Sequence, residues 1–275
     1  MSLYINKHFK THIKDNTYLK PSYKIENNVS FDSDIENPYY IFFRLYDVEY
    51  INPLSPSSIL KFGVDTTEIY DIHASHVSIN FTLKDSFYGL TSGGKYQLAI
   101  ESCTNSKANK FTKLCNPITS NQITYAIAVT KEEWENTKTF VEDYASSTDT
   151  RFSIIQDFKI AKFATVRKFF TDKEKQPFGN MTYPKDRYYN LKKKVMGVKK
   201  ENHFICSSFI AYSLISNVQK IKDWFDEKKI NYRYVNVTDV VNIPGCQRLF
   251  SSKFNEYNKA TTEFAELNPS FKLYL

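Results

Sequence analysis

The spacing of apolar and polar residues predicts β-strands in the first half of the chain. Residues 76–83 alternate between the two classes, with Val77, Ile79, Phe81 and Leu83 at every second position. Because side chains of a strand point alternately to opposite faces, this period of two predicts a half-buried strand. The apolar run at 38–46 predicts another, and so do residues 95–101 and 123–129.

Helical spacing follows the last of these strands. Thr130 precedes residues 131–144 and has Glu133 three residues on, which is the pattern of a capping box. The mostly apolar stripe of this segment consists of Trp134, Thr137, Phe140, Val141 and Tyr144. Residues 205–215 predict a buried helix and 216–229 a further one. Together the patterns predict an α+β fold, with a small antiparallel sheet packed against the helix that begins near Cys206.

The domain organisation follows from length and local composition. A chain of 275 residues fits one substantial domain, and no internal repeat is present. Residues 1–38 are polar and predict an N-terminal extension, and 39–275 predict a single domain. Within it, residues 159–200 form a basic insertion interrupted by proline and glycine.

Charge is concentrated in that insertion. Residues 159–200 hold 13 Lys and Arg against 3 Asp and Glu, whereas the whole chain has a net charge of +7. Two interpretations stay open. The segment could bind nucleic acid or an anionic lipid surface through its lysines and tyrosines, or it could be a solvated lid over a substrate cleft.

Composition excludes several classes of protein. Apolar residues make up 41% and aromatic residues 16% of the chain, which excludes a disordered chain. No apolar run reaches the length of a membrane-spanning helix, and residues 1–20 lack the apolar core of a signal peptide. Four cysteines without a CxxC pair predict no disulfide framework. We therefore expect a cytoplasmic protein, and the abundance of Lys, Asn, Ile, Tyr and Phe suggests a virus, a phage or an AT-rich bacterium, with host cytoplasm or virion as the setting.

Three residues predict thiol chemistry. His76 begins a predicted strand, Glu101 ends another, and Cys206 enters a helix. A helix N-terminus lowers the pKa of a cysteine, an imidazole can accept the thiol proton, and a third polar group can orient that imidazole. Each residue also has a structural interpretation: a buried cysteine that packs as a small apolar group, a structural histidine and a surface acid.

Other histidines and cysteines leave alternatives open. His73 competes with His76 as the base, although His76 leads directly into the alternating strand. His73 and His76 with Cys103 and Cys115 could ligate zinc, but their spacing fits no zinc pattern. We therefore expect no metal and no cofactor, and we expect Cys246 in a loop.

These segments resemble a known family. Residues 75–79 (SHVSI), 99–101 (AIE) and 204–210 (FICSSFI) resemble the circularly permuted NlpC/P60 papain-like hydrolases, which include YiiX-like, poxvirus-type and lecithin–retinol acyltransferase-like proteins. Residues 150–153 (TRFS) and 237–241 (VTDVV) are similar to shorter family segments, the second without its proline. Ser78 stands where the family often has glycine.

The resemblance implies a permuted papain-like fold in which Cys206 is the nucleophile, His76 the general base and Glu101 the orienting acid. It implies a cysteine peptidase or amidase that works through a thioester acyl-enzyme on a peptide or amide. Acyl transfer or cleavage of an acyl-lipid ester or thioester on the same triad is one alternative. A catalytically inactive papain-like structural or binding protein, for instance in a virion, is the other.

Overall fold

A computed structural model describes the parts of the chain from which the fold is built. They are residues 23–27, 29–31, 34–46, 68–69, 72–73, 76–90, 98–102, 121–147, 150–152, 203–237 and 239–275. The basic insertion at 159–200 lies outside these residues.

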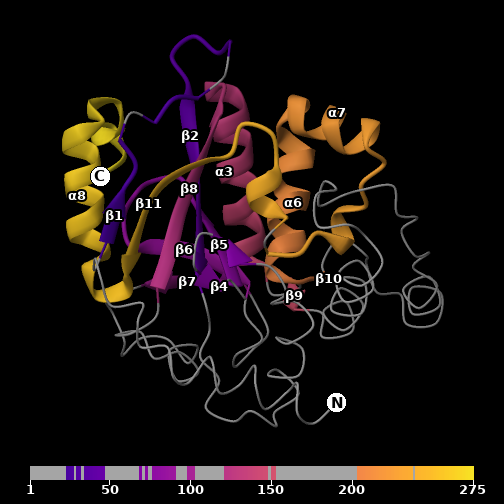
Figure 1. Ribbon diagram of the computed structural model, residues 1–275. Coiled ribbons are helices and arrows are strands. Elements are labelled where there is room, and N and C mark those ends of the chain that lie inside the picture. The colour runs from indigo at the N-terminus through magenta and orange to yellow at the C-terminus, as the bar shows by residue number, and fades with distance from the viewer. Residues whose placement is uncertain are drawn as a thin grey trace, which may run out of the picture.

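An antiparallel sheet of seven strands forms the centre of the fold (Figure 1). In spatial order the strands are β1 (Tyr23–Ile25), β11 (Gln247–Lys253), β8 (Asn121–Val129), β2 (Tyr39–Tyr46), β5 (His76–Asn80), β6 (Ser86–Leu90) and β7 (Leu98–Ser102). Two short pairs lie apart from this sheet: β3 (Glu68–Ile69) with β4 (Ile72–His73), and β9 (Arg151–Phe152) with β10 (His203–Phe204). The predicted α+β class and the antiparallel sheet are confirmed.

Helices cover both faces of the sheet, as Figure 1 shows. On one face lie α3 (Lys131–Ser146), α6 (Cys206–Asn217) and α7 (Gln219–Glu227). On the other face lie α8 (Tyr257–Leu267) and the 3-10 helix η6 (Pro269–Tyr274). Three further 3-10 turns are η3 (Tyr232–Tyr234), η4 (Val240–Asn242) and η5 (Phe254–Glu256). Among the described residues, no helix is long and apolar enough to cross a membrane.

The sheet therefore separates two apolar cores, which we call the α6 core and the α8 core. Alternate residues of β2 divide between them: Ile41, Phe43 and Leu45 face the α6 core, whereas Phe42 and Tyr46 face the α8 core. A strand that is buried on both faces loses the clean alternation of apolar and polar residues. This explains why 38–46 is an almost continuous apolar run.

Strand β5 corrects one expectation. The prediction of a half-buried strand was wrong, because His76, Ser78 and Asn80 on the second face are also buried. The strand ends at Asn80, and Leu83, in the bend that follows, joins the α8 core rather than the α6 core. The reason is that His76 and Ser78 lie beside Tyr46 and Arg44 of β2, whose side chains are also buried.

Helix α3 begins as predicted. Thr130 is its N-cap: the Glu133 backbone N–H donates to Thr130 Oγ1 at 3.2 Å, and the Thr130 N–H donates to Glu133 Oε2 at 2.9 Å. Thr137 and Val141 of the predicted stripe are buried. The capping box is thus confirmed, since it depends only on residues three apart.

Part of the predicted N-terminal extension belongs to the sheet. Residues 23–25 form the edge strand β1, which pairs antiparallel with β11. The division into an extension and a single domain otherwise stays a prediction.

Candidate functional site

Cys206 is the first residue of α6, as the sequence predicts. Two serines fix this end of the helix. Ser208 Oγ accepts a hydrogen bond from the Ile205 N–H at 2.9 Å and donates to the Ile205 carbonyl at 3.2 Å. Ser207 Oγ donates to the Val235 carbonyl at 2.7 Å, which ties the start of α6 to the segment before η4. These bonds fix the first turn of α6, which carries Cys206, against the segment between η3 and η4.

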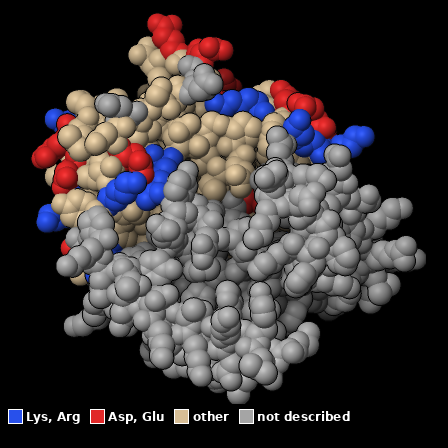
Figure 2. All heavy atoms as spheres, in the orientation of Figure 1, with Lys and Arg blue, Asp and Glu red and all other residues tan. Residues whose placement is uncertain are grey.

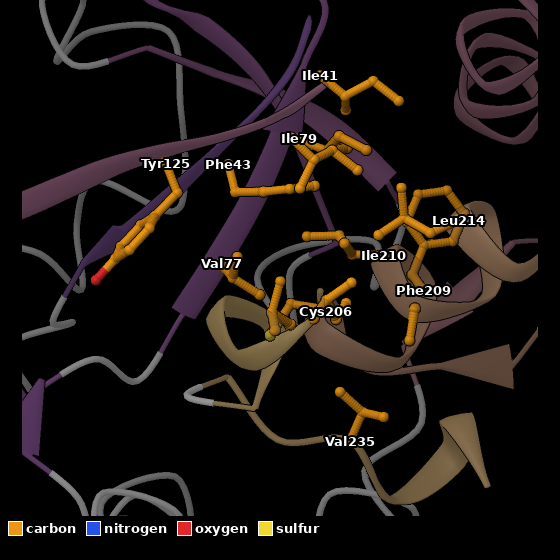
Figure 3. Close-up of a cluster of buried hydrophobic side chains, with 14 of the residues drawn as sticks. Ile41, Phe43, Val77, Ile79, Tyr125, Cys206, Phe209, Ile210, Leu214 and Val235 are labelled. Atoms are coloured by element: carbon orange, nitrogen blue, oxygen red, sulfur yellow. The ribbon is translucent and has the colours of Figure 1, made fainter. Parts of the chain in front are cut away.

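The surroundings of Cys206 are apolar. Its exposed fraction is 6%, and it belongs to the α6 core. Figure 3 shows Val77 and Ile210 close to it in this cluster. Because α6 packs against β5 through these side chains, the cysteine fills space between helix and sheet.

His76 lies on the other side of β5. Its backbone is paired with Tyr46 of β2, and the two rings are 5.0 Å apart between centroids. Tyr46 belongs to the α8 core, whereas Val77, the next residue of β5, belongs to the α6 core with Cys206. His76, with an exposed fraction of 5%, is therefore buried on the α8 face of the sheet.

The structure thus does not bring His76 and Cys206 together. Successive side chains of a strand point to opposite faces, so the sheet lies between the imidazole and the sulfur. Glu101 is in β7, where its backbone is paired with Phe87, but its side chain lies outside the described residues, as does that of His73 in β4. The catalytic assignment of the three residues stays a prediction.

A buried charge on the α8 face was missed by the sequence analysis. Arg44 of β2 has no exposed surface, and its Nη1 donates to the Asp85 carbonyl at 3.1 Å and to Asp85 Oδ1 at 3.3 Å. The guanidinium also lies 4.3 Å from the centroid of the Phe87 ring, within range of a cation–π interaction. The sequence contains a signal for this buried charge, because Arg44 is the one charged residue in the apolar run at 38–46.

The remaining cysteines and the metal alternative can be placed in part. Cys246 lies in the loop between η4 and β11, as predicted, and burial raises the pKa of its thiol. Cys103 and Cys115 lie outside the described residues. Where the chain is described, no group of three or more His, Cys, Asp or Glu is placed to hold a metal ion.

Comparisons with known proteins identify no relative. No family model matches the chain, and neither a curated protein nor a solved structure matches it.

Proposed function

We propose that this chain is a non-catalytic binding or structural module with a permuted papain-like arrangement. The arrangement is supported by the order along the chain: the strand with His76, the strand with Glu101, and the helix that begins at Cys206 and packs on an antiparallel sheet.

One observation carries the functional part of the proposal. Cys206 is buried among apolar side chains of the α6 core, while His76 contacts Tyr46 on the α8 face. A thiol nucleophile needs a base within hydrogen-bond reach and access for its substrate. The thiol of Cys206 has little access to solvent and lies across the sheet from the His76 imidazole, which supports a role of this cysteine in packing.

The second candidate is the cysteine hydrolase, or an acyltransferase on the same residues. It is favoured by the position of Cys206 as the first residue of a twelve-residue helix, since the first backbone N–H groups of a helix can bind the oxyanion of an acyl intermediate. Its substrate would be a peptide, an amide or an acyl lipid.

Alkylation of Cys206 distinguishes the two candidates. We would treat the native protein with iodoacetamide from pH 5.5 to pH 9 and follow each cysteine by mass spectrometry, in wild type, in His76→Ala and in Ser78→Ala. Ser78 is the matched control, because it is buried on the same face of β5 as His76. Cys246 is an internal reference for a thiol whose pKa is raised.

For a non-catalytic module, Cys206 reacts slowly at every pH and quickly only after unfolding in urea, and the two variants behave alike. Rapid alkylation of Cys206 below about pH 7, under the ordinary thiol pKa, would overturn the proposal if His76→Ala abolishes it and Ser78→Ala does not. That result would establish a thiolate–imidazole pair.

A further inference from the structure

The edge of the sheet next to α8 is formed by the segment that precedes β2. Of residues 23–36 the structure describes 23–27, 29–31 and 34–36, which we call the strap. The strap begins with β1, the last strand in the spatial order of the sheet, which pairs antiparallel with β11 (Figure 1). The loop that leads from the strap into β2 projects beyond the sheet at the top of Figure 1. The strap therefore lies at the periphery of the fold.

The strap is attached by contacts that a second copy of the chain can also offer. The Tyr23 hydroxyl donates to Glu263 Oε2 at 2.6 Å, and Glu26 Oε1 lies 3.2 Å from Arg248 Nε. The half-buried side chain of Ile25 packs against the α8 core. These partners belong to α8, to β11 and to the core that both border, and so to the part of the chain that follows the strap. The same contacts are therefore available on another molecule.

The turn between the strap and β2 contains a strained residue. Asn37 is exposed and has a φ of 54°, in the left-handed region. Asparagine adopts this conformation more readily than most residues. Pro38 follows it, however, and the residue before a proline normally keeps an extended backbone. Opening of the turn to an extended conformation releases this strain, and strained hinge loops favour the exchange of elements between protomers.

The chain between β1 and β2 is longer than the closed turn needs. Ile25 is paired with Phe250, which is paired with Thr124 of β8, whereas Tyr39 is paired with Val129 of the same strand. At strand spacings of about 4.8 Å and a rise of about 3.4 Å per residue, the end of β1 and the start of β2 are about 22 Å apart. The chain between them spans up to about 45 Å when it is extended. An open strap can therefore reach the β11 of a second molecule.

The surface around the strap carries charges of both signs. Lys24 Nζ lies 3.9 Å from Glu26 Oε1, and Lys259 Nζ lies 5.3 Å from the centroid of the Tyr23 ring, whose hydroxyl is bonded to Glu263. Figure 2 shows acidic and basic side chains together on this side of the molecule, at the left of the view. Two copies that exchange an element bring identical surfaces together. A patch of one sign would repel its own copy, whereas mixed charge does not.

We propose that two copies of this chain exchange their straps. In the exchanged dimer the turn at Asn37 and Pro38 is extended, β1 of each copy pairs with β11 of the other, and Tyr23 donates to Glu263 across the interface. The exchange is two-fold symmetric and therefore closes at two copies. It replaces contacts within one molecule by the same contacts between two, so the released strain opposes the entropy of association and the dimer depends on concentration. Strap exchange does not involve Cys206, so it is tested independently of the proposed function.

Size-exclusion chromatography with light scattering on the full chain, from about 5 to about 500 μM, tests the exchange. We would compare wild type with Asn37→Val, in which a β-branched residue disfavours the left-handed turn, and with Asn37→Gly, which permits it. Lys229→Val is the matched control. Lys229 is also exposed and has a φ of 53°, but it follows α7 and lies outside the strap.

Mixed disulfides identify the surface that the dimer uses. Lys24 of β1 is paired directly with Ser251 of β11. A chain with Lys24→Cys and a chain with Ser251→Cys can therefore form a disulfide with each other when β1 of the first lies on β11 of the second. The two chains are mixed, oxidised and analysed by mass spectrometry. In the control mixture, a chain with Glu227→Cys, at an exposed position of α7, replaces the one with Ser251→Cys.

We expect wild type to dimerise as its concentration rises, Asn37→Val to dimerise at concentrations about tenfold lower and Asn37→Gly at concentrations about tenfold higher, because each dimer opens two turns. Lys229→Val should dimerise as wild type does, and the disulfide between positions 24 and 251 should form in the mixture. The proposal is overturned if wild type and Asn37→Val stay monomeric throughout this range, if a dimer forms without that disulfide, or if Asn37→Val and Lys229→Val shift dimerisation equally.

Discussion

Glu133 caps two helices with one carboxylate, and its replacement is the sharpest test of how the helical layer is held together. Oε2 accepts from the Thr130 N–H at 2.9 Å and so completes the capping box of α3. Oε1 accepts from the Gln219 N–H at 3.1 Å, at the first residue of α7. Glu133→Ala removes both contacts, whereas Thr130→Ala weakens only the cap of α3.

The expected loss follows from these contacts. Removing a capping interaction costs about 1 kcal/mol. The bond to α7 uses a charged acceptor but is exposed to solvent, so we assign it about 1 kcal/mol as well. Glu133→Ala should therefore lower the free energy of unfolding by about 2 kcal/mol and Thr130→Ala by about 1 kcal/mol, whereas Glu132→Ala at an exposed neighbour should change it by less than about 0.5 kcal/mol.

Urea denaturation followed by circular dichroism measures these differences, and Glu133→Ala should also lower the Tm by about 4 °C. Glu133→Gln, which keeps an acceptor oxygen without the charge, should fall between wild type and Glu133→Ala. If Glu133→Ala costs no more than Thr130→Ala, the contact between α3 and α7 contributes nothing and the reasoning fails.

Three further predictions concern single side chains. Asp85→Ala leaves the buried guanidinium of Arg44 without this carboxylate and should lower the free energy of unfolding, measured in urea, by about 3 kcal/mol. Adding Arg44→Met to the Asp85→Ala variant should recover most of that loss. A loss below about 1 kcal/mol for Asp85→Ala alone would contradict the argument. Lys229 follows α7 and has a φ of 53°, a backbone conformation that favours glycine. Lys229→Gly should therefore raise the free energy of unfolding by about 0.5–1 kcal/mol in urea denaturation. A decrease would show that the lysine side chain stabilises the turn. Burial raises the pKa of Tyr274 to about 12 in the folded chain, so the stability linked to its neutral form should be lost as the pH rises from about 10 to 12. Tyr274→Phe should flatten this pH dependence of the free energy of unfolding in denaturation curves. The variant also removes the oxygen that accepts from the Tyr40 N–H at 3.2 Å.

Local features of the fold were predictable from the sequence because they depend on near neighbours. The capping box of α3, the strand at 123–129 and the helix that begins at Cys206 all follow from residues within a few positions of one another. Helix α8 was not predicted, although its signal was present. Its buried positions, Tyr257, Ala260, Thr261, Phe264 and Ala265, have helical spacing.

The candidate site was harder to predict because it depends on which face of the sheet each layer covers. Alternation along β5 separates His76 from Val77, but it does not say which of the two faces Cys206. That choice follows from the order of the strands and from the side on which α6 crosses them, and both are long-range properties. The burial of Ser78 was missed for the same reason, because what covers the second face of the sheet cannot be inferred from the sequence of β5 alone.

The pairing of β1 with β11 sets the time at which the sheet can be completed during synthesis. Tyr23 is paired with Ser252, so the first described strand has to wait for a partner made more than 200 residues later. At ribosomal rates of about 5–20 residues per second, that delay is on the order of 10–50 s. Until β11 emerges, the outer edge of β8 and the apolar residues that α8 will cover are open to other chains. A nascent chain of this topology therefore keeps an unpaired strand edge until its synthesis is almost complete.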